Sequence, residues 1–230
     1  MSAPVSVVVP TLGAVETIGP CLEALTEGVI AGLVRELVVA DGGSTDGIAA
    51  VADAVGAELV VTPPGRGRQL AAGAAAARGT WLLFVHADTV LAPGWPAAVR
   101  RHMRAHPGCA GWFPLAFDAD GLAPRLVAAW ANLRASTLGL PFGDQGLLVP
   151  AALYRESGGY PALPLMEDVA IARALGRRRL RRLGGRAVTS AERYRRDGWV
   201  GRGWRNLTTQ ALFLAGVPAG RLVRRYRGRG

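Results

Sequence analysis

The amino-acid sequence predicts an α/β fold, in which a mostly parallel central sheet is flanked by helices and followed by a C-terminal helical extension. Over the first 120 residues, short runs rich in β-branched residues alternate with alanine-rich stretches. The short runs are almost continuously apolar, as strands buried on both faces should be. Strands that alternate with helices in this way are typical of βαβ units, whose strands are parallel.

Four strands and three helices are expected in this first half. The strands are expected at Val5–Val9, Glu36–Ala40, Ala57–Val61 and Trp81–His86. The helices are expected at Thr17–Ala31, Thr45–Val55 and Arg68–Ala77. Ser44 precedes the second helix as an expected N-cap, and Gly79 is expected to end the third, because these residue types suit helix starts and ends.

Beyond Pro93 the pattern loosens, but further elements are still expected. They are a helix to about His106, a strand at Gly111–Phe117, a helix at Pro124–Leu138, a strand at Gly146–Val149, a helix at Ala151–Glu156 and a helix starting near Glu167. An amphipathic region from Trp204 to Tyr226, broken by Gly216 and Pro218, closes the pattern. It is expected either to pack on the domain or to form a peripheral membrane foot with its arginines on headgroups. No repeat, linker or composition break marks a boundary, so one domain is expected over residues 1–230. Its parts are a nucleotide-binding half (1–120), an acceptor and catalytic half (121–200) and a basic helical tail (201–230).

Composition narrows the class of protein. Half of the 230 residues are apolar, but no run of 18 or more uncharged apolar residues occurs, so a membrane-spanning helix is not expected. The first residues lack the pattern of a secretory signal, which favours a cytoplasmic location. Cys21 and Cys109 have no Cys-x-x-Cys spacing, and neither a disulfide framework nor a zinc cluster is expected.

The formal net charge of +10 comes from arginine alone, since the sequence contains no lysine. Such a charge favours anionic ligands or surfaces. The densest basic runs, Arg177–Arg186 and Arg221–Arg229, are expected either to contact phospholipid headgroups peripherally or to be simply solvated. Nucleic acid is not favoured as a partner, because aromatic-rich basic stripes and helix-turn-helix or zinc-finger spacings are missing.

Polar residues follow three of the expected strands. The first strand ends in Pro10-Thr11-Leu12-Gly13, the second in Asp41-Gly42-Gly43-Ser44, and the fourth in His86-Ala87-Asp88. In an open parallel sheet, ligands bind at the carboxyl ends of the strands, so these ends are expected to form one rim. Taken alone, the Asp-Gly-Gly sequence is only a turn.

These motifs resemble family 2 glycosyltransferases, which pair a Val-x-Val-x-Val-Pro-Thr first strand with an Asp-Gly-Ser-x-Asp-Gly turn. The strings Gly143-Asp144-Gln145-Gly146 and Pro164-Leu165-Met166-Glu167-Asp168-Val169 are similar to a small bacterial subgroup associated with radical SAM and selenium-related proteins. The resemblance runs from Val5 to about Tyr226. It implies the GT-A fold and an inverting transfer of a sugar from a nucleotide-diphosphate donor, with UDP as the favoured nucleotide.

The resemblance also implies a donor site. Thr11 and Asp41, with the adjacent Pro10 and Gly43, would hold the nucleotide base and ribose. Arg66 and Arg68 would hold phosphate, a role that guanidinium groups and a helix N-terminus both favour. The alternative for the two arginines is a solvated loop before a helix. Relatives often have Asn where this chain has Ala71, so any contact of that amide is absent.

The family's Asp-x-Asp signature is replaced here by His86-Ala87-Asp88. Asp88 would hold a divalent metal, Mg²⁺ or Mn²⁺, since a carboxylate oxygen is a suitable ligand for either ion. His86 and Ala87 would lie against the donor. His86 could contact ribose or phosphate, ligate a softer ion, or only pack at the strand end.

The general base is expected at Asp168, because the family uses the Asp of this Glu-Asp pair at a helix N-terminus. Glu167 would help to position the acceptor or the base. Two acids placed favourably on a helix dipole are the simpler explanation of the pair. Asp144 is a second catalytic candidate.

Two further contacts follow from the resemblance. Gly143 and Gln145, on either side of Asp144, would form the sugar or acceptor pocket, unless their loop is only a hairpin turn. Arg193 matches one arginine of a Ser-x-Arg-Arg segment in relatives and would stabilise the leaving diphosphate. Glu192 stands where relatives have the other arginine.

Other functions fit the sequence less well. A nucleotidyltransferase usually has a Gly-rich loop bearing Lys or Arg after the first strand, which this chain lacks. An oxidoreductase would need Gly-x-Gly-x-x-Gly there. A non-catalytic protein that binds sugar nucleotides or a membrane surface would need neither Asp88 nor Asp168. The acceptor stays open between a lipid carrier, a carotenoid-like apolar molecule, a small metabolite and an unusual heteroatom nucleophile.

Overall fold

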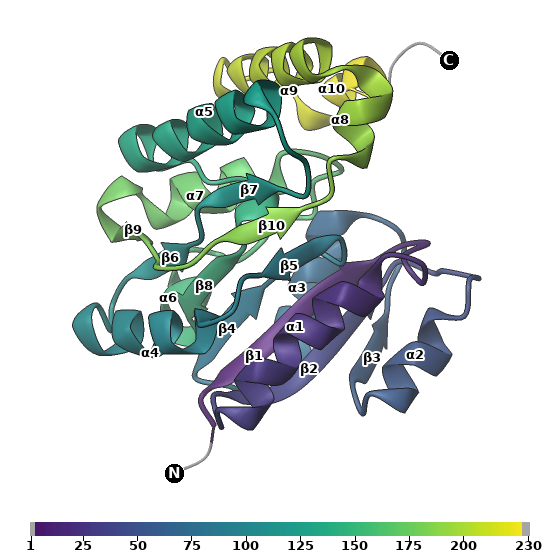
Figure 1. Ribbon diagram of the computed structural model, residues 1–230, viewed down its shortest axis with the longest axis vertical. Helices are drawn as coiled ribbons and strands as arrows, with labels where there is room; N and C mark the ends of the chain where they lie inside the picture. The colour runs from purple at the N-terminus through teal and green to yellow at the C-terminus, as the bar shows by residue number, and fades with distance from the viewer. Residues whose placement is uncertain (1–2, 227–230) are drawn as a thin grey trace.

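A computed structural model describes residues 3–226 of the chain and contains two sheets (Figure 1). The larger sheet has seven strands in the order β3-β2-β1-β4-β8-β6-β9. Neighbouring strands are parallel except for β8, which runs antiparallel to both β4 and β6. The strands span Val5–Thr11 (β1), Val34–Asp41 (β2), Glu58–Val61 (β3), Trp81–Phe84 (β4), Ala110–Trp112 (β6), Leu147–Pro150 (β8) and Leu180–Arg182 (β9).

Helices cover both faces of this sheet. In β1, Val7 and Val9 pack into one buried cluster with α1, α2 and α4, whereas Val8 packs into a second cluster with α3, α6 and α7. Successive side chains of a strand point to opposite faces, so the continuous valine run is buried on both sides. These helices span Ile18–Ile30 (α1), Ile48–Ala54 (α2), Arg66–Ala76 (α3), Trp95–Ala105 (α4), Ala151–Glu156 (α6) and Glu167–Leu175 (α7).

A three-stranded sheet lies beside the first, in the order β5-β10-β7. Its strands span Thr89–Leu91 (β5), Leu115–Phe117 (β7) and Ala187–Thr189 (β10). The backbone N–H of Ser190 donates to the carbonyl of Asp88, so the end of β10 lies against the end of the β4 loop. This contact brings the second half of the chain to the polar rim of the first.

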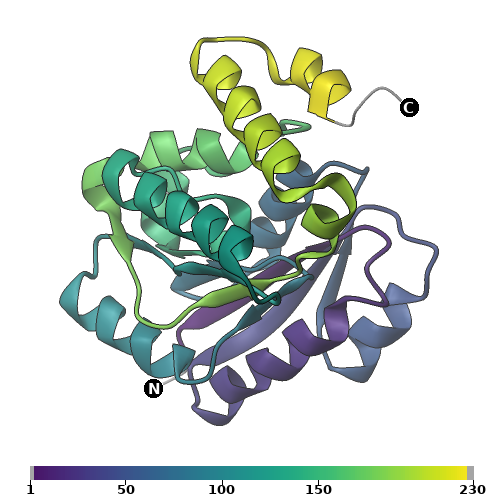
Figure 2. The ribbon, with the colours of Figure 1, turned by 45° about the horizontal axis from the view of Figure 1, so that its top comes forward.

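The remaining helices lie at one end of the molecule, where α5 and α9 are side by side in both views (Figures 1 and 2). They span Leu122–Leu138 (α5), Glu192–Asp197 (α8), Trp199–Leu214 (α9) and Ala219–Tyr226 (α10). The expected break at Gly216 and Pro218 is confirmed, and Gly216 takes a left-handed φ of 90°. Across residues 3–226, no helix combines the length and apolar character needed to span a bilayer. Arg227 and Arg229, part of an expected basic run, lie outside the described residues.

Several boundaries differ from the sequence prediction. The expected strand Gly111–Phe117 is two strands, β6 and β7, which belong to different sheets. They separate at Phe113 and Pro114, because proline has no N–H for a sheet and Phe113 donates its N–H to the carbonyl of Gln145 instead. The strands β5, β9 and β10 were not predicted, since runs of three residues carry almost no periodicity.

Two predicted helix ends were also wrong. Helix α2 begins at Ile48 after Gly47, and Ser44 does not cap it. The hydroxyl of Ser44 donates to Asp41 instead and accepts the N–H of Gly13. Helix α3 ends at Ala76, before Gly79. A Cβ on Gly79 would lie 2.6 Å from the Ser6 backbone nitrogen. Glycine is therefore needed here because the backbone at residue 79 lies close to that of Ser6.

Candidate functional site

A pocket opens where the end of β4 meets the second half of the chain. Its walls come from the start of α3, the loop after β4, the short 3₁₀ helix Gly143–Gln145, the start of α7, the end of β10, and α8 and α9. Seven residues singled out from the sequence line it: Arg66, His86, Asp88, Gly143, Asp144, Asp168 and Arg193. Carboxylates and guanidinium groups therefore converge from segments far apart in the sequence.

Eight other predicted site residues are not among those that line this pocket. They are Pro10, Thr11, Asp41, Gly43, Arg68, Ala87, Gln145 and Glu167. Gln145 is fully buried; its Oε1 accepts the N–H of Phe142 and its Nε2 donates to Asn132. Its amide therefore holds the Gly143–Gln145 turn against α5.

Asp41 shapes the turn at the end of β2. Its carboxylate accepts hydrogen bonds from the hydroxyls of Thr11 and Ser44 and from the backbone N–H groups of Gly43 and Ser44. Burial tends to raise the pKa of Asp41, but these hydrogen bonds outweigh it and leave the pKa below its usual value. A ribose hydroxyl would have to share or replace one of them.

Gln69, which the sequence did not single out, joins the ends of β1 and β2. Its Nε2 donates to the carbonyl of Thr11 at 2.5 Å and to that of Ala40 at 3.1 Å. Gln69 is buried against Gly42, where a Cβ would lie 3.2 Å from its amide. Gly42, the first glycine of the Asp-Gly-Gly turn, therefore lets Gln69 pack closely against the turn.

Arg66 and Glu167 form an ion pair between the first residues of α3 and α7. Glu167 is buried, and Arg66 is half-buried and lines the pocket. Burial raises the pKa of Glu167, although Arg66 opposes this effect. Glu167 thus does not line the pocket itself but contacts Arg66, which does.

Helix α7 starts from a strained residue. Met166 is buried and has φ of 64°, and among residues 3–226 no other non-glycine residue has a positive φ. Asp168 Oδ2 accepts the N–H of Gly143 at 2.9 Å, and its Oδ1 accepts the N–H of Val169. The helix start is thus tied to the Gly143–Gln145 turn, and such strain often marks functional sites.

His86 lies against Gly143, where a Cβ would be 2.4 Å from its Nε2. A side chain at position 143 would clash with the imidazole, so the turn can lie this close to His86 only because the residue is glycine. Burial, followed by the charge of Arg66, lowers the pKa of His86 to about 4. The imidazole is therefore neutral at neutral pH.

Asp144 is half-buried, and its Oδ1 is shielded from solvent without a hydrogen-bond partner among the described residues. Burial raises its pKa to about 6, against the attraction of Arg134 and with the repulsion of Asp168 and Asp88. Arg134 is itself buried and stacks over the Phe142 ring at 3.4 Å. Asp144 is therefore repelled by two other carboxylates of the pocket, Asp168 and Asp88, and is attracted by the buried cation of Arg134.

Asp88 is partly exposed, and its Oδ2 lies 3.9 Å from a terminal nitrogen of Arg193. Within residues 3–226, no group of three or more His, Cys, Asp or Glu side chains is placed to hold a metal ion by itself. The open carboxylate nevertheless fits a hard divalent cation that takes its remaining oxygen ligands from a bound diphosphate.

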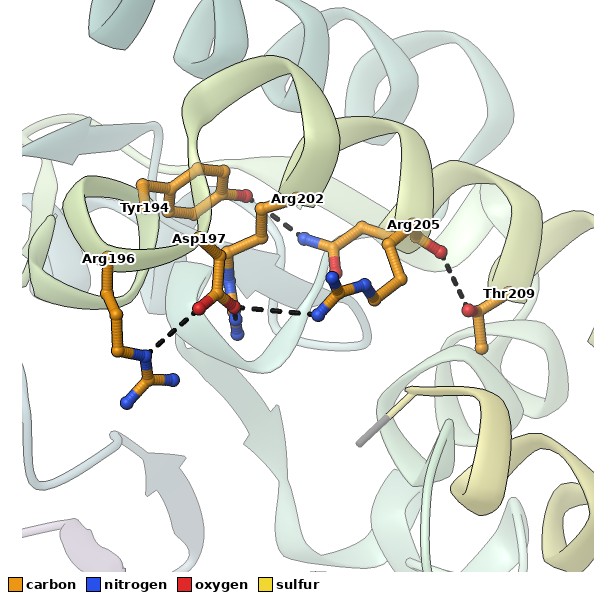
Figure 3. Close-up of polar contacts among 7 residues, drawn as sticks. Tyr194, Arg196, Asp197, Arg202, Arg205 and Thr209 are labelled. Carbon is orange, nitrogen blue, oxygen red and sulfur yellow. Dashed lines mark hydrogen bonds and ion pairs between the residues drawn. The ribbon is translucent and has the colours of Figure 1, made fainter. Parts of the chain in front are cut away.

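Apart from Arg193 on α8, no residue of the wall formed by α8 and α9 was predicted to contribute to the site. Asp197 accepts hydrogen bonds from Arg196 and Arg202 and lies 3.6 Å from Arg205 (Figure 3). Asn206 donates to the hydroxyl of Tyr194. Arg202, Asn206 and Tyr194 all line the pocket. The only sequence signal was the spacing of Arg202 and Asn206 on an amphipathic helix.

Comparisons with known proteins agree with this architecture. A family model described as glycosyl transferase family 2 matches residues 6–150. The glucosyl-3-phosphoglycerate synthases of Mycolicibacterium paratuberculosis and Mycolicibacterium smegmatis are 37% and 40% identical over 95 residues. Each match covers 37% of this chain but only 29% and 31% of the relatives, so the chain matches under a third of their length. These relatives are not the radical SAM-associated subgroup expected from the motifs.

Solved structures match over more of the chain. Glucosyl-3-phosphoglycerate synthase from Mycobacterium tuberculosis, in complex with Mn²⁺, uridine-diphosphate and glucosyl-3-phosphoglycerate, has a TM-score of 0.61 at 22% identity, covering 94% of this chain and 81% of that one. S. aureus TarS 1-349 has a TM-score of 0.60 at 16% identity, covering 90% and 64%. At these identities the likeness shows the fold alone. The predicted mainly parallel α/β architecture with C-terminal helices is confirmed.

Proposed function

The chain belongs to glycosyl transferase family 2, and we propose that it transfers a sugar from a nucleotide-diphosphate donor to an acceptor with inversion at the anomeric carbon. The observation that carries the proposal is the convergence of Asp88, Asp168 and Arg193 on one pocket at the carboxyl end of β4. A UDP-sugar is the proposed donor, because the structural neighbours include complexes with uridine-diphosphate and uridine-diphosphate-glucose.

The proposed donor site extends from the ends of β1 and β2 to the pocket. Pro10, Thr11, Asp41 and Gly43 would receive the base and ribose. The remaining proposed donor contacts are Arg66, Arg68, His86, Ala87, Gly143 and Arg193. Gln145 would act indirectly, because its buried amide holds the Gly143–Gln145 turn. Arg66 and Arg193 line the pocket with cationic side chains, which favour negative charge developing on the leaving diphosphate.

A divalent metal, Mg²⁺ or Mn²⁺, is the proposed cofactor, and the similar structures with Mn²⁺ support it. Asp88 would hold it together with the donor's phosphate oxygens. When bound, such an ion supplies positive charge that stabilises the leaving group.

We propose Asp168 as the general base. The acceptor's nucleophilic oxygen would form a bond to the anomeric carbon as the bond to the diphosphate breaks, and its proton would pass to the Asp168 carboxylate. The hydrogen bond from Gly143 orients that carboxylate. Glu167 would act through Arg66. Asp144 stays a second candidate, because it lines the same pocket and its Oδ1 has no hydrogen-bond partner among residues 3–226.

The acceptor is proposed from the chemistry of the α8–α9 wall. Arg193, Arg202 and Asn206 favour an acceptor that carries an anionic group. The phosphoglyceric acid found with a structural neighbour is a small metabolite of this kind, and a phosphate-bearing lipid is the other class.

Membership of the radical SAM-associated subgroup also stays a proposal, supported by the motifs at Gly143–Gly146 and Pro164–Val169.

The proposal extends to the whole sequence. Residues 1–230 would form one GT-A domain, comprising the nucleotide-binding half, the acceptor half and the helical tail. The proposed location is cytoplasmic, with peripheral contact at the inner face of the membrane. Small-molecule partners, rather than nucleic acid, are proposed.

Calorimetric titration of UDP and UDP-glucose, with and without Mn²⁺, tests the donor site. Wild type should bind UDP more tightly with Mn²⁺, and Asp88→Ala should lose this metal-dependent gain. Asp53→Ala, which removes an exposed carboxylate on α2, is the matched control. Absence of binding to any uridine nucleotide would contradict the proposed donor. Unchanged metal-dependent binding in Asp88→Ala would contradict the metal assignment.

A non-catalytic function is tested separately. Transfer of glucose from UDP-glucose to 3-phosphoglycerate or to a polyprenyl phosphate should be detected by mass spectrometry and should require Asp168. Tight UDP-glucose binding that survives loss of both Asp88 and Asp168, without any turnover, would favour a sugar-nucleotide-binding protein instead.

A further inference from the structure

Two neighbouring helices, α5 and α9, each carry an exposed row of large apolar side chains. On α5 the row is Leu122, Leu126, Trp130 and Leu133, which are between 52% and 77% exposed. Spacings of three and four residues place these side chains on one helix face. Apolar residues normally occupy the buried face of such a helix, so their position on the outer face needs an explanation.

The row on α9 follows the same spacing. It consists of Val200, Trp204, Leu207 and Leu214, of which Val200 is 86% exposed and Trp204 is 66% exposed. Leu207 is half-buried. We name these eight residues of the two helices the α5–α9 face.

Both rows point away from the core. The buried residues of α5, such as Ala128 and Ala131, lie on the opposite side of that helix, and the same is true of Arg202 and Thr209 on α9. The two helices pack against the same small cluster, which contains Phe117. They lie side by side at one end of the molecule (Figure 2). The two helices that carry the exposed rows are therefore neighbours, and both rows face outward.

The surroundings of the α5–α9 face are basic. The sequences of α5, α9 and α10 contain no aspartate or glutamate. At the C-terminal end of α5, Arg177, Arg181 and Arg182 line a second pocket together with residues of the last helical turn. Ahead of its N-terminal end, Arg195 donates to the carbonyl of Asp118 and lies 3.9 Å from the Asp118 carboxylate. The excess of cationic side chains is therefore at the C-terminal end of the apolar row, whereas Arg195 at the other end is paired with an acid.

We propose that the α5–α9 face docks on the surface of an anionic phospholipid bilayer. Its leucine and tryptophan side chains would enter the boundary between headgroups and acyl chains, and the flanking arginines would contact lipid phosphates. Charge decides between a bilayer and a second copy of the chain. A second copy would bring two chains of net charge +10 together, whereas an anionic bilayer supplies the opposite charge.

Docking would also place the candidate pocket close to the lipid. Arg202 and Asn206 line the pocket from α9, the helix whose outer side carries Val200 and Trp204. The pocket would then lie roughly one helix diameter, ~10 Å, from the bilayer surface. The docking itself does not depend on the proposed sugar transfer, because it can be measured without donor or acceptor.

Flotation with vesicles tests this inference on the full chain. Wild type should float with vesicles of phosphatidylcholine mixed with phosphatidylglycerol and much less with phosphatidylcholine alone. The double variant Trp130→Ser/Trp204→Ser should lower the partition coefficient by about tenfold or more, because it removes two interfacial aromatic side chains. Ile30→Ser/Val61→Ser removes two apolar side chains, 86% and 65% exposed, from other elements and should bind like wild type. Thermal unfolding should confirm that both variants are folded.

Three results would overturn the proposal. The first is no binding to anionic vesicles by a folded wild-type chain. The second is equal vesicle binding by wild type and Trp130→Ser/Trp204→Ser, which would mean that arginine attraction alone is responsible. The third is a wild-type dimer in sedimentation that this variant dissociates, without vesicle binding, which would identify the α5–α9 face as an interface between copies.

Discussion

The backbone N–H of Gly143 donates a hydrogen bond of 2.9 Å to Oδ2 of Asp168. The two residues are 25 positions apart in the sequence and belong to a short 3₁₀ helix and to the start of α7. This bond fixes one oxygen of the carboxylate that we propose as the base. It also links the orientation of the base to the Gly143–Gln145 turn. Glycine is needed at position 143 of this turn to avoid a clash with His86.

Replacing Asp168 with Asn should separate catalysis from folding. The amide oxygen of asparagine can still accept the Gly143 N–H, but the side chain cannot take a proton from the acceptor. We expect turnover of UDP-glucose to fall by about 10²–10⁴-fold, while UDP binding changes little. Single-turnover transfer assays and calorimetry measure the two quantities. A variant that retains wild-type turnover would remove Asp168 from the role of base and would leave Asp144 as the candidate.

Arg66 and Glu167 form one ion pair, but removing Arg66 should lower the free energy of unfolding more than removing the charge of Glu167. Arg66→Ala leaves a buried carboxylate without this cation, and we expect a loss of about 1–3 kcal/mol in the free energy of unfolding at neutral pH. Glu167→Gln leaves a cation that is about one-third exposed. The expected loss is therefore smaller, under about 1 kcal/mol. Urea unfolding measures both, and equal losses would contradict the role of burial.

Two glycines at equivalent positions of α3 and α1 provide a matched test of packing. A Cβ on Gly67 would lie 2.2 Å from the carbonyl oxygen of Pro161, whereas a Cβ on Gly19 would meet nothing within 4 Å. Gly67→Ala should cost about 1–3 kcal/mol, because backbone must move. Gly19→Ala should be neutral or stabilising by up to about 1 kcal/mol, since alanine favours a helix. Thermal and urea unfolding distinguish these outcomes. Equal changes in stability for the two variants would mean that the segment around Pro161 moves at little energetic cost.

The strands that the sequence predicted correctly have four or more residues, most of them apolar. The valine run of β1 has to be buried on both faces, and this requirement predicts both the sheet and its flanking helices. The strands β9 and β10 are three residues long, so their pairing depends on tertiary contacts that no local pattern encodes. Pro114, by contrast, was a visible signal that the expected strand Gly111–Phe117 should be divided.

The sequence likewise predicted part of the candidate site. Asp88 and Asp168 were identified because each follows a recognisable motif, and the fold brings both to one pocket. Side-chain direction was not predictable: Gln145 and Asp144 are adjacent, but only Asp144 lines the pocket. Arg202 and Asn206 lie on a helix outside every motif. Their contribution follows from the packing of α9 against the rest of the site.

Asp144 should make the stability of the unliganded protein depend on pH. Its folded-state pKa of about 6 lies above the usual value of 3.8, so the folded protein holds a proton on this side chain over a range where the unfolded chain has lost it. The free energy of unfolding therefore falls as the pH rises from about 4 to about 6. Above that range the penalty is constant, and below pH 4 it is absent.

Asp144→Asn removes this penalty, because asparagine does not ionise. We expect the variant to be more stable than wild type by about 1–3 kcal/mol at pH 7.5 and similar to wild type at pH 4. Urea unfolding at the two pH values measures the difference, with Asp53→Asn as an exposed control that should change stability by less than about 0.5 kcal/mol at either pH. A gain of equal size at both pH values would mean that the ionised carboxylate is not the cause, and a loss at pH 7.5 would mean that the charge of Asp144 stabilises Arg134 more than its burial costs.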